Sequence, residues 1–103
     1  MRRDSKPDIE VPRKARFAAP GGADAATGWI VGLSVVGAEI ESLQPPPISG
    51  EVVVRTELVD GEGEVVLRGR VQWVKPTRFA VQFGPLGVRE TSAIVKASRR
   101  AVA

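Results

Sequence analysis

The stretch that most constrains the fold of this chain is residues 63–84, which read GEVVLRGRVQWVKPTRFAVQFG. Apart from Gly69, apolar side chains recur at every second position on both sides of a Lys-Pro-Thr-Arg segment: Val65, Leu67, Val71, Trp73, Phe79, Val81 and Phe83. Successive side chains of a strand point to opposite faces, so this alternation predicts one buried face and one charged face. Two such runs joined by a short proline-containing turn predict a β-hairpin.

A second stretch of alternation, at residues 28–43, predicts two more strands. The expected inward-facing residues are apolar: Trp29, Val31, Leu33, Val35, Ala38 and Ile40. The phase shifts by one residue at Gly37, which is typical of a tight turn or a bulge. We therefore expect strands at 29–33 and 38–43, joined by a turn at 34–37.

The remaining elements complete a small β domain. Alternation over residues 52–58 predicts a strand that ends at an Asp-Gly turn signal at 60–61, and a short strand is expected near Phe17. Residues 87–103 change to a helical period, with cations in the last turns that suit the helix dipole. Several antiparallel strands followed by one helix predict a mainly β fold, namely a small barrel with a helix packed on it.

Composition narrows the chemistry that the chain can perform. The 103 residues include no cysteine and no histidine, so thiolate chemistry, the usual base near neutral pH and the commonest zinc ligand are all missing. Ser34 has no histidine to activate it, and the pair Glu39 and Glu41 is typical of a solvated strand face. We expect one domain that is not an enzyme and has no metal site.

Charge is unevenly distributed along the chain, although the net charge is only +3. Residues 1–16 and 87–103 each carry an excess of three basic residues, whereas residues 17–86 carry an excess of three acidic ones. Nucleic-acid-binding domains normally present a basic face on the body itself, so we expect no nucleic acid partner. Because no apolar run is long enough to span a bilayer and no signal peptide is recognisable, we expect no membrane insertion and a cytoplasmic location.

Two segments carry candidate binding groups. Residues 1–12 contain two prolines and no sustained period, so we expect a flexible charged arm ahead of a barrel domain at 13–103. Arg13, Lys14 and Arg16 could form an anion clamp just before the first strand, or they could simply be solvated. The turn at 34–37 offers a serine and exposed backbone N–H groups that could hold a polar ligand, although such residues are also common in ordinary turns.

Three pieces in order resemble the PilZ domain family: an Arg-containing segment, LSVVGAEIE at 33–41, and RGRVQWV with RFAVQFGPL at 68–86, followed by a helix. The resemblance covers residues 13–100. It implies a six-stranded antiparallel β-barrel with a C-terminal helix that serves bacterial signalling by cyclic di-GMP. The nucleotide is then the candidate ligand, and no cofactor is implied.

Family members that bind this nucleotide share two motifs, and this sequence departs from both. In the motif Asp/Asn-x-Ser-x-x-Gly, the serine corresponds to Ser34 and the glycine to Gly37, but the Asp/Asn position is Gly32. The second motif is a pair of arginines separated by three positions just before the barrel, whereas two positions separate Arg13 from Arg16. Each lost charge-assisted contact costs about 1.5–3 kcal/mol, so two losses imply binding weakened by about 10²- to 10⁴-fold.

These departures favour a stand-alone regulatory adaptor that acts through protein contacts, in motility or surface behaviour, with nucleotide binding weak or lost. The alternative is a true cyclic di-GMP receptor that uses Arg13, Arg16, Ser34 and Gly37, with the N-terminal arm closing on the nucleotide. A nucleic-acid-binding barrel is a third hypothesis, disfavoured by the acidic body and the inward phase of the aromatic residues.

For the adaptor, the expected protein-contact surface lies near Val53, Val59 and the C-terminal helix. Both valines are apolar residues on the phase that we expect to face outward.

Overall fold

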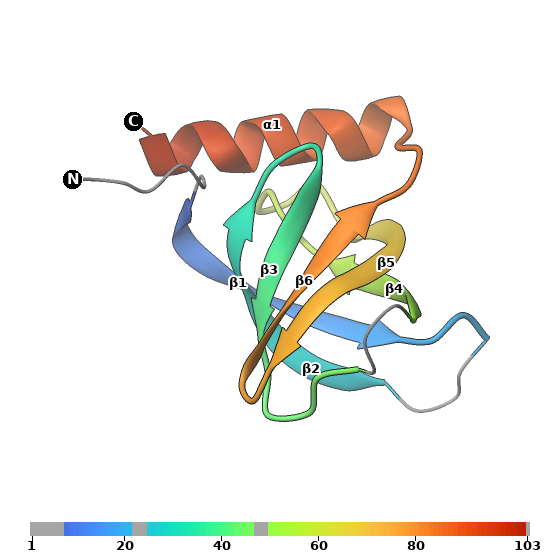
Figure 1. Cartoon of the computed structure of the whole chain (residues 1–103). Coiled ribbons are helices and arrows are strands. Elements are labelled where there is room, and N and C mark those ends of the chain that lie inside the picture. Colours follow the sequence, from blue (N-terminus) through green and yellow to red (C-terminus); the bar gives the residue numbers. More distant parts are fainter. Residues whose placement is uncertain (1–7, 22–24, 47–49, 103) are drawn as a thin grey trace.

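The computed structural model describes residues 8–21, 25–46 and 50–102 of the chain. The elements found there, in order, are β1 (Asp8–Ala18), β2 (Ala26–Leu33), β3 (Gly37–Glu41), β4 (Glu51–Thr56), β5 (Val65–Lys75), β6 (Arg78–Phe83) and α1 (Val88–Val102). Figure 1 shows α1 lying across one end of the barrel. The predicted fold, a six-stranded antiparallel barrel with a C-terminal helix, is confirmed.

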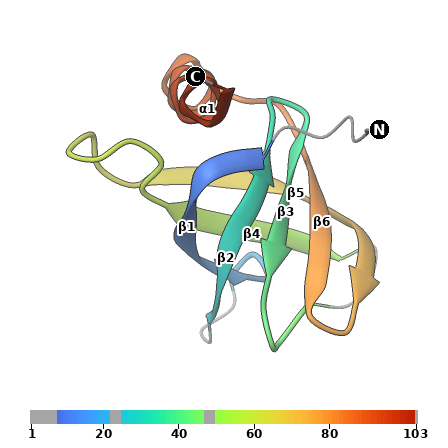
Figure 2. The same ribbon diagram turned by 90° about the vertical axis from the view of Figure 1, so that its left-hand side faces the viewer.

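The six strands close on themselves in the order β1-β2-β3-β6-β5-β4. Every neighbouring pair is antiparallel, and closure is made by β1, which pairs with β2 on one side and with β4 on the other. Figure 2, turned by 90°, shows β1 curving from α1 toward the opposite end of the barrel. This strand begins at Asp8, so the predicted boundary between arm and barrel at residues 12–13 falls inside it. Residues 1–7 of the arm predicted for residues 1–12 lie outside the described residues.

The predicted hairpin is formed by β5 and β6, but a bulge alters its inward face. Val71 pairs with Val81, and the next pair is Trp73 with Ala80, so Gln72 is an extra residue on β5. Because one extra residue moves all later side chains to the opposite face, Val74 takes the inward place opposite Phe79. The prediction that Trp73 faces inward is therefore wrong, since it lies on the outer face.

Strand β2 has the opposite phase to the predicted one at its start. Ile30 is fully buried, whereas Trp29 is 49% exposed. A second bulge lies between Ile30 and Gly32 in the pairing with β3, and it returns Leu33 to the core. The inward positions predicted for Leu33, Ala38 and Ile40 are confirmed, and those predicted for Trp29 and Val35 are wrong.

The core fills the barrel and extends to the underside of α1. Phe17 and Phe79 meet edge to face inside it, with ring centroids 4.8 Å apart. The helix contributes small or branched residues to the same cluster, namely Ala93, Ile94 and Ala97. Small side chains let the helix approach the barrel closely, so α1 closes one end of the core. In the described part of the chain, no helix is both long enough and apolar enough to cross a membrane.

Candidate functional site

The predicted turn at residues 34–37 joins β2 to β3 and is held by its own polar groups. The Ser34 N–H donates to the Gly37 carbonyl at 2.9 Å, and the Ser34 Oγ accepts from the Val36 N–H at 3.2 Å. The Phe83 N–H of β6 donates to the Val36 carbonyl at 2.8 Å, which ties the turn to the neighbouring strand. The Ser34 hydroxyl thus stabilises the turn that displays it.

Gly37 has a packing role in this turn. A Cβ atom built on it would lie 2.2 Å from the Val81 carbonyl oxygen of β6, which is too close for two atoms that are not bonded. Glycine is therefore required for β3 to approach β6 here. This requirement explains the glycine of the motif without reference to a ligand.

A pocket of about 260 Å³ lies beside the turn, on the outer face of the barrel. Its lining residues come from β2, β3, β5 and β6: Gly32, Leu33, Ser34, Val36, Gly37, Ala38, Glu39, Gln72, Ala80, Val81 and Gln82. The amides of Gln72 and Gln82 are hydrogen-bonded to each other across the hairpin. Among these described lining residues there is a carboxylate but no lysine or arginine, so the lining supplies hydrogen-bonding groups without positive charge for a phosphate.

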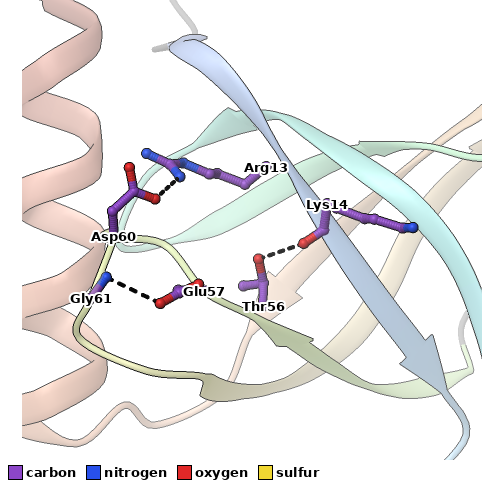
Figure 3. Close-up of polar contacts among 6 residues, drawn as sticks. All are labelled: Arg13, Lys14, Thr56, Glu57, Asp60 and Gly61. Carbon is purple, nitrogen blue, oxygen red and sulfur yellow. Dashed lines mark hydrogen bonds and ion pairs between the residues drawn. The ribbon is translucent and has the colours of Figure 1, made fainter.

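Arg13 and Arg16 belong to β1, so the prediction that they stand before the first strand is wrong. Arg13 forms an ion pair with Asp60 at 2.6 Å, as Figure 3 shows, and Arg16 forms one with Glu64 at 2.9 Å. Both carboxylates belong to the segment between β4 and β5. The structure therefore directs both arginines toward this segment and away from the pocket at the turn, which neither of them lines.

We call residues 57–64 the acidic loop, because Glu57, Asp60, Glu62 and Glu64 lie in it. Its tip is shaped by Gly61, which has a φ of 83° and whose N–H donates to the Glu57 carboxylate at 3.2 Å. Helix α1 contacts the same loop: Lys96 pairs with Glu62 at 2.9 Å, and Arg89 donates to the backbone carbonyls of Glu62 and Glu64. Cations from β1 and α1 thus hold one anionic segment of the chain itself.

The ion pairs of the acidic loop should contribute modestly to stability. We expect Asp60→Asn combined with Glu64→Gln to lower the free energy of unfolding by about 1 kcal/mol, because exposed pairs are each worth about 0.2–1 kcal/mol. The loss should shrink in about 1 M salt, which screens exposed charges. Urea denaturation at low and high salt measures both effects. A loss that is the same at both salt concentrations would contradict an ionic contribution.

The predicted protein-contact residues are not exposed as expected. Val53 is only 9% exposed, because its outward position on β4 lies between Ala18 of β1 and Arg68 of β5. Val59 is half-buried and packs against the core from the acidic loop. The large apolar residues that the structure does expose are Trp29, Val35, Val36, Leu43 and Val88. The exposure of Trp29 could not be predicted from the alternation of apolar residues. The bulge in β2 changes which face the side chains take, and it cannot be recognised from the sequence.

The sequence matches the model of the family described as PilZ domain over residues 2–99. The chain belongs to the PilZ domain family. Proteins of this family serve bacterial signalling through cyclic di-GMP, and they are typically adaptors that bind it without catalysis. No curated protein sequence matches the chain. Within the described residues, no cluster of acidic side chains is arranged to hold a metal ion.

Solved structures share the fold of this PilZ domain. The PilZ domain of CeSA from a cellulose-synthesizing bacterium superposes with a TM-score of 0.72 at 22% identity, over 92% of this chain and 97% of that one. The inhibitor of motility MotI/DgrA of Bacillus subtilis gives 0.68 at 8% identity, over 97% of this chain and 51% of that one. MrkH of K. pneumonia gives 0.69 at 14% identity, over 99% of this chain and 50% of that one. This chain thus spans about half the length of the last two proteins.

Proposed function

We propose that this PilZ domain is a small regulatory adaptor in bacterial signalling, of motility or surface behaviour, that acts through protein contacts and binds cyclic di-GMP weakly or not at all. The observation that carries the proposal is the engagement of Arg13 and Arg16 by Asp60 and Glu64. A nucleotide that used these arginines would have to displace two carboxylates of the same chain.

The pocket at the turn supports the same conclusion. Gly32 brings no side chain to the position where nucleotide-binding relatives carry Asp or Asn. The lining residue Glu39 adds negative charge, and Arg78 lies 3.5 Å from its carboxylate. A nucleotide bound in this pocket would lack its contacts with an Asp or Asn side chain and with the two arginines, each worth about 1.5–3 kcal/mol.

A second candidate function, a true cyclic di-GMP receptor, is favoured by the position of β1. Strand β1 begins at Asp8, and the residues ahead of it in the sequence, 1–7, read MRRDSKP. Arg2 and Lys6 are separated there by three positions, which is the spacing of the arginine pair in nucleotide-binding relatives, with lysine in place of the second arginine. Lysine supplies charge to a phosphate but not the planar stacking surface of arginine.

Calorimetric titration with cyclic di-GMP distinguishes the two functions. We expect no binding heat up to high-micromolar nucleotide for the native chain. Micromolar binding would overturn the adaptor proposal, and two double variants would then locate the site. Loss of binding in Arg13→Ala with Arg16→Ala would assign the nucleotide to β1, whereas loss in Arg2→Ala with Lys6→Ala would assign it to the segment before β1.

A further inference from the structure

A second hollow, which we call the Trp29 cleft, lies at the end of the barrel opposite α1. It has a volume of about 580 Å³, and the segment that follows β3 forms one of its walls. Figures 1 and 2 both show this segment at the far end of the barrel from the helix. The lining residues that matter here are Lys14, Trp29, Glu41, Leu43 and Thr77.

Two large, exposed apolar side chains line the cleft. Trp29 is 49% exposed and Leu43 is 87% exposed, and both line the same hollow. Tryptophan is one of the residue types that are enriched at the energetic centres of protein interfaces. Neither residue belongs to the hydrophobic core cluster, so both are free to contact a ligand.

The walls of the cleft are fixed by hydrogen bonds. The Ser42 Oγ donates to the Thr27 carbonyl at 2.9 Å and accepts from the Gln44 N–H at 3.0 Å, and the Ser42 N–H donates to the Thr77 carbonyl at 3.0 Å. These bonds join the segment after β3 to β2 and to the turn between β5 and β6. A cleft that is already formed spares a ligand part of the entropy cost of ordering its site.

The two tryptophans of the chain differ in how their rings are covered. Lys75 lies over the ring of Trp73, with its Nζ 4.9 Å from the ring centroid. No cation of the described residues covers Trp29 in this way. The ring of Trp29 is thus available for a ligand, while that of Trp73 already has a partner.

The charge of the cleft points to an anionic ligand. Trp29 pairs with Lys14 on β1 and with Glu41 on β3, so opposite charges flank the indole. Glu41 is already paired with Arg78 at 2.7 Å. Within the described part of the chain, the Lys14 ammonium has no ion pair or hydrogen bond, and Figure 3 shows it pointing away from the acidic loop. Among the described lining residues of the cleft, the charge without an ion pair is therefore the positive charge of Lys14.

We propose that the Trp29 cleft binds an extended peptide segment of a partner protein, in which an aliphatic or proline residue packs on Trp29 and Leu43 and a neighbouring acidic residue pairs with Lys14. Lys14 and Glu41 lie on the strands that flank β2, so they are two strand spacings apart, about 10 Å. A peptide of about three extended residues is long enough to cross the cleft between them. The inference rests on the proposed adaptor function, for which it supplies the docking site and the chemistry of the partner.

The variant Trp73→Phe makes Trp29 the sole tryptophan and its fluorescence a direct reporter of the cleft. The probe is a pool of blocked hexapeptides Gly-X-Pro-Asp-X-Gly, in which X is Leu, Ile, Val or Phe. We expect a saturable change in the emission of Trp29. Replacing Asp by Asn in the peptides should weaken binding about 2- to 5-fold, as expected for one exposed ion pair. No saturable change at millimolar peptide would overturn the proposal.

Two further variants test the named contacts by fluorescence anisotropy of labelled peptide. Leu43→Asp, at a position that is almost fully exposed, should abolish binding while leaving the denaturation curve unchanged. Lys14→Glu should reverse the preference between the Asp peptides and a matched Lys set. Binding that survives Leu43→Asp, or a preference that Lys14→Glu leaves unreversed, would each overturn the proposal.

The result is separable from the test of the adaptor function. Absence of peptide binding, together with absence of nucleotide binding in calorimetry, would reject the Trp29 cleft and leave an adaptor that docks elsewhere. Micromolar nucleotide binding would reject the adaptor function, whereas the fluorescence change of Trp29 would still report directly on the cleft. Saturable binding of a poly-dT oligonucleotide in place of the peptides would overturn the proposal in favour of nucleic acid.

Discussion

Replacing Phe79 by alanine should lower the free energy of unfolding by about 3–5 kcal/mol, which is the range for Phe-to-Ala changes in a core. Phe79 is the largest of the fully buried side chains, and its ring meets Phe17 at the centre of the barrel. A domain of this size has a total stability of about 5–15 kcal/mol. The variant should therefore melt more than about 10 °C below the native chain.

Urea denaturation and thermal unfolding, followed by circular dichroism, measure this loss. Leu43→Ala is a matched control, because it also truncates a large apolar side chain but at a position that is 87% exposed. We expect the control to remain within about 0.5 kcal/mol of the native chain. Equal losses in both variants would contradict the placement of Phe79 at the centre of the core.

Gly37→Ala should also destabilise the domain, by about 3 kcal/mol, which is at the upper end for overpacking. The added Cβ would meet the Val81 carbonyl oxygen at 2.2 Å, and backbone atoms cannot move aside as the end of a flexible side chain can. To relieve this clash, β3 and the turn at 34–37 would have to move away from β6. Chemical denaturation measures the loss.

Gly84→Ala is the control for this substitution. The atom nearest to a Cβ built on Gly84 is the Arg68 carbonyl oxygen at 3.8 Å, an ordinary contact distance. We expect this variant to unfold within about 0.5 kcal/mol of the native chain. If Gly37→Ala proved as harmless as the control, the glycine of the motif would need another explanation than strand packing.

The fold could be predicted from the sequence because its signals are local. The alternation of apolar residues in 63–84 specifies two strands, and the Lys-Pro-Thr-Arg segment between them specifies a turn, so no distant residue is needed to recognise the hairpin. The change of period after Gly87 predicts α1 in the same way, and α1 begins at Val88. The resemblance to the PilZ family then supplied the number of strands and the closure of the barrel.

The phase of individual residues could not be predicted where strands contain bulges. Gln72 breaks the alternation on β5, and the bulge after Ile30 does so on β2. A bulge is defined by the register of the partner strand, and register is not written in the strand itself. The alternation therefore predicts both tryptophans on the inward face, whereas both lie on the outer one, so the Trp29 cleft cannot be recognised from the sequence.

The candidate site was predicted in part. The turn with Ser34 and Gly37 follows from local signals and was found. The ion pairs of Arg13 and Arg16 join residues 47 and 48 positions apart in the sequence, across the pairing of β1 with β4. Only closure of the barrel brings these charges together, so the sequence could show the basic residues of β1 and the acidic loop but not their contact.

The closed barrel also limits how a partner can bind. Because β1 pairs with both β2 and β4, each of the six strands has a partner on both sides over at least part of its length. A closed sheet therefore offers a partner less backbone to extend by strand addition than the open sheet edges of many peptide-binding β domains do. We expect recognition to rely mainly on side chains on the outer wall, in the loops or on α1. Specificity in this domain should accordingly change through substitution of surface residues, while the backbone pairing that defines the fold stays the same.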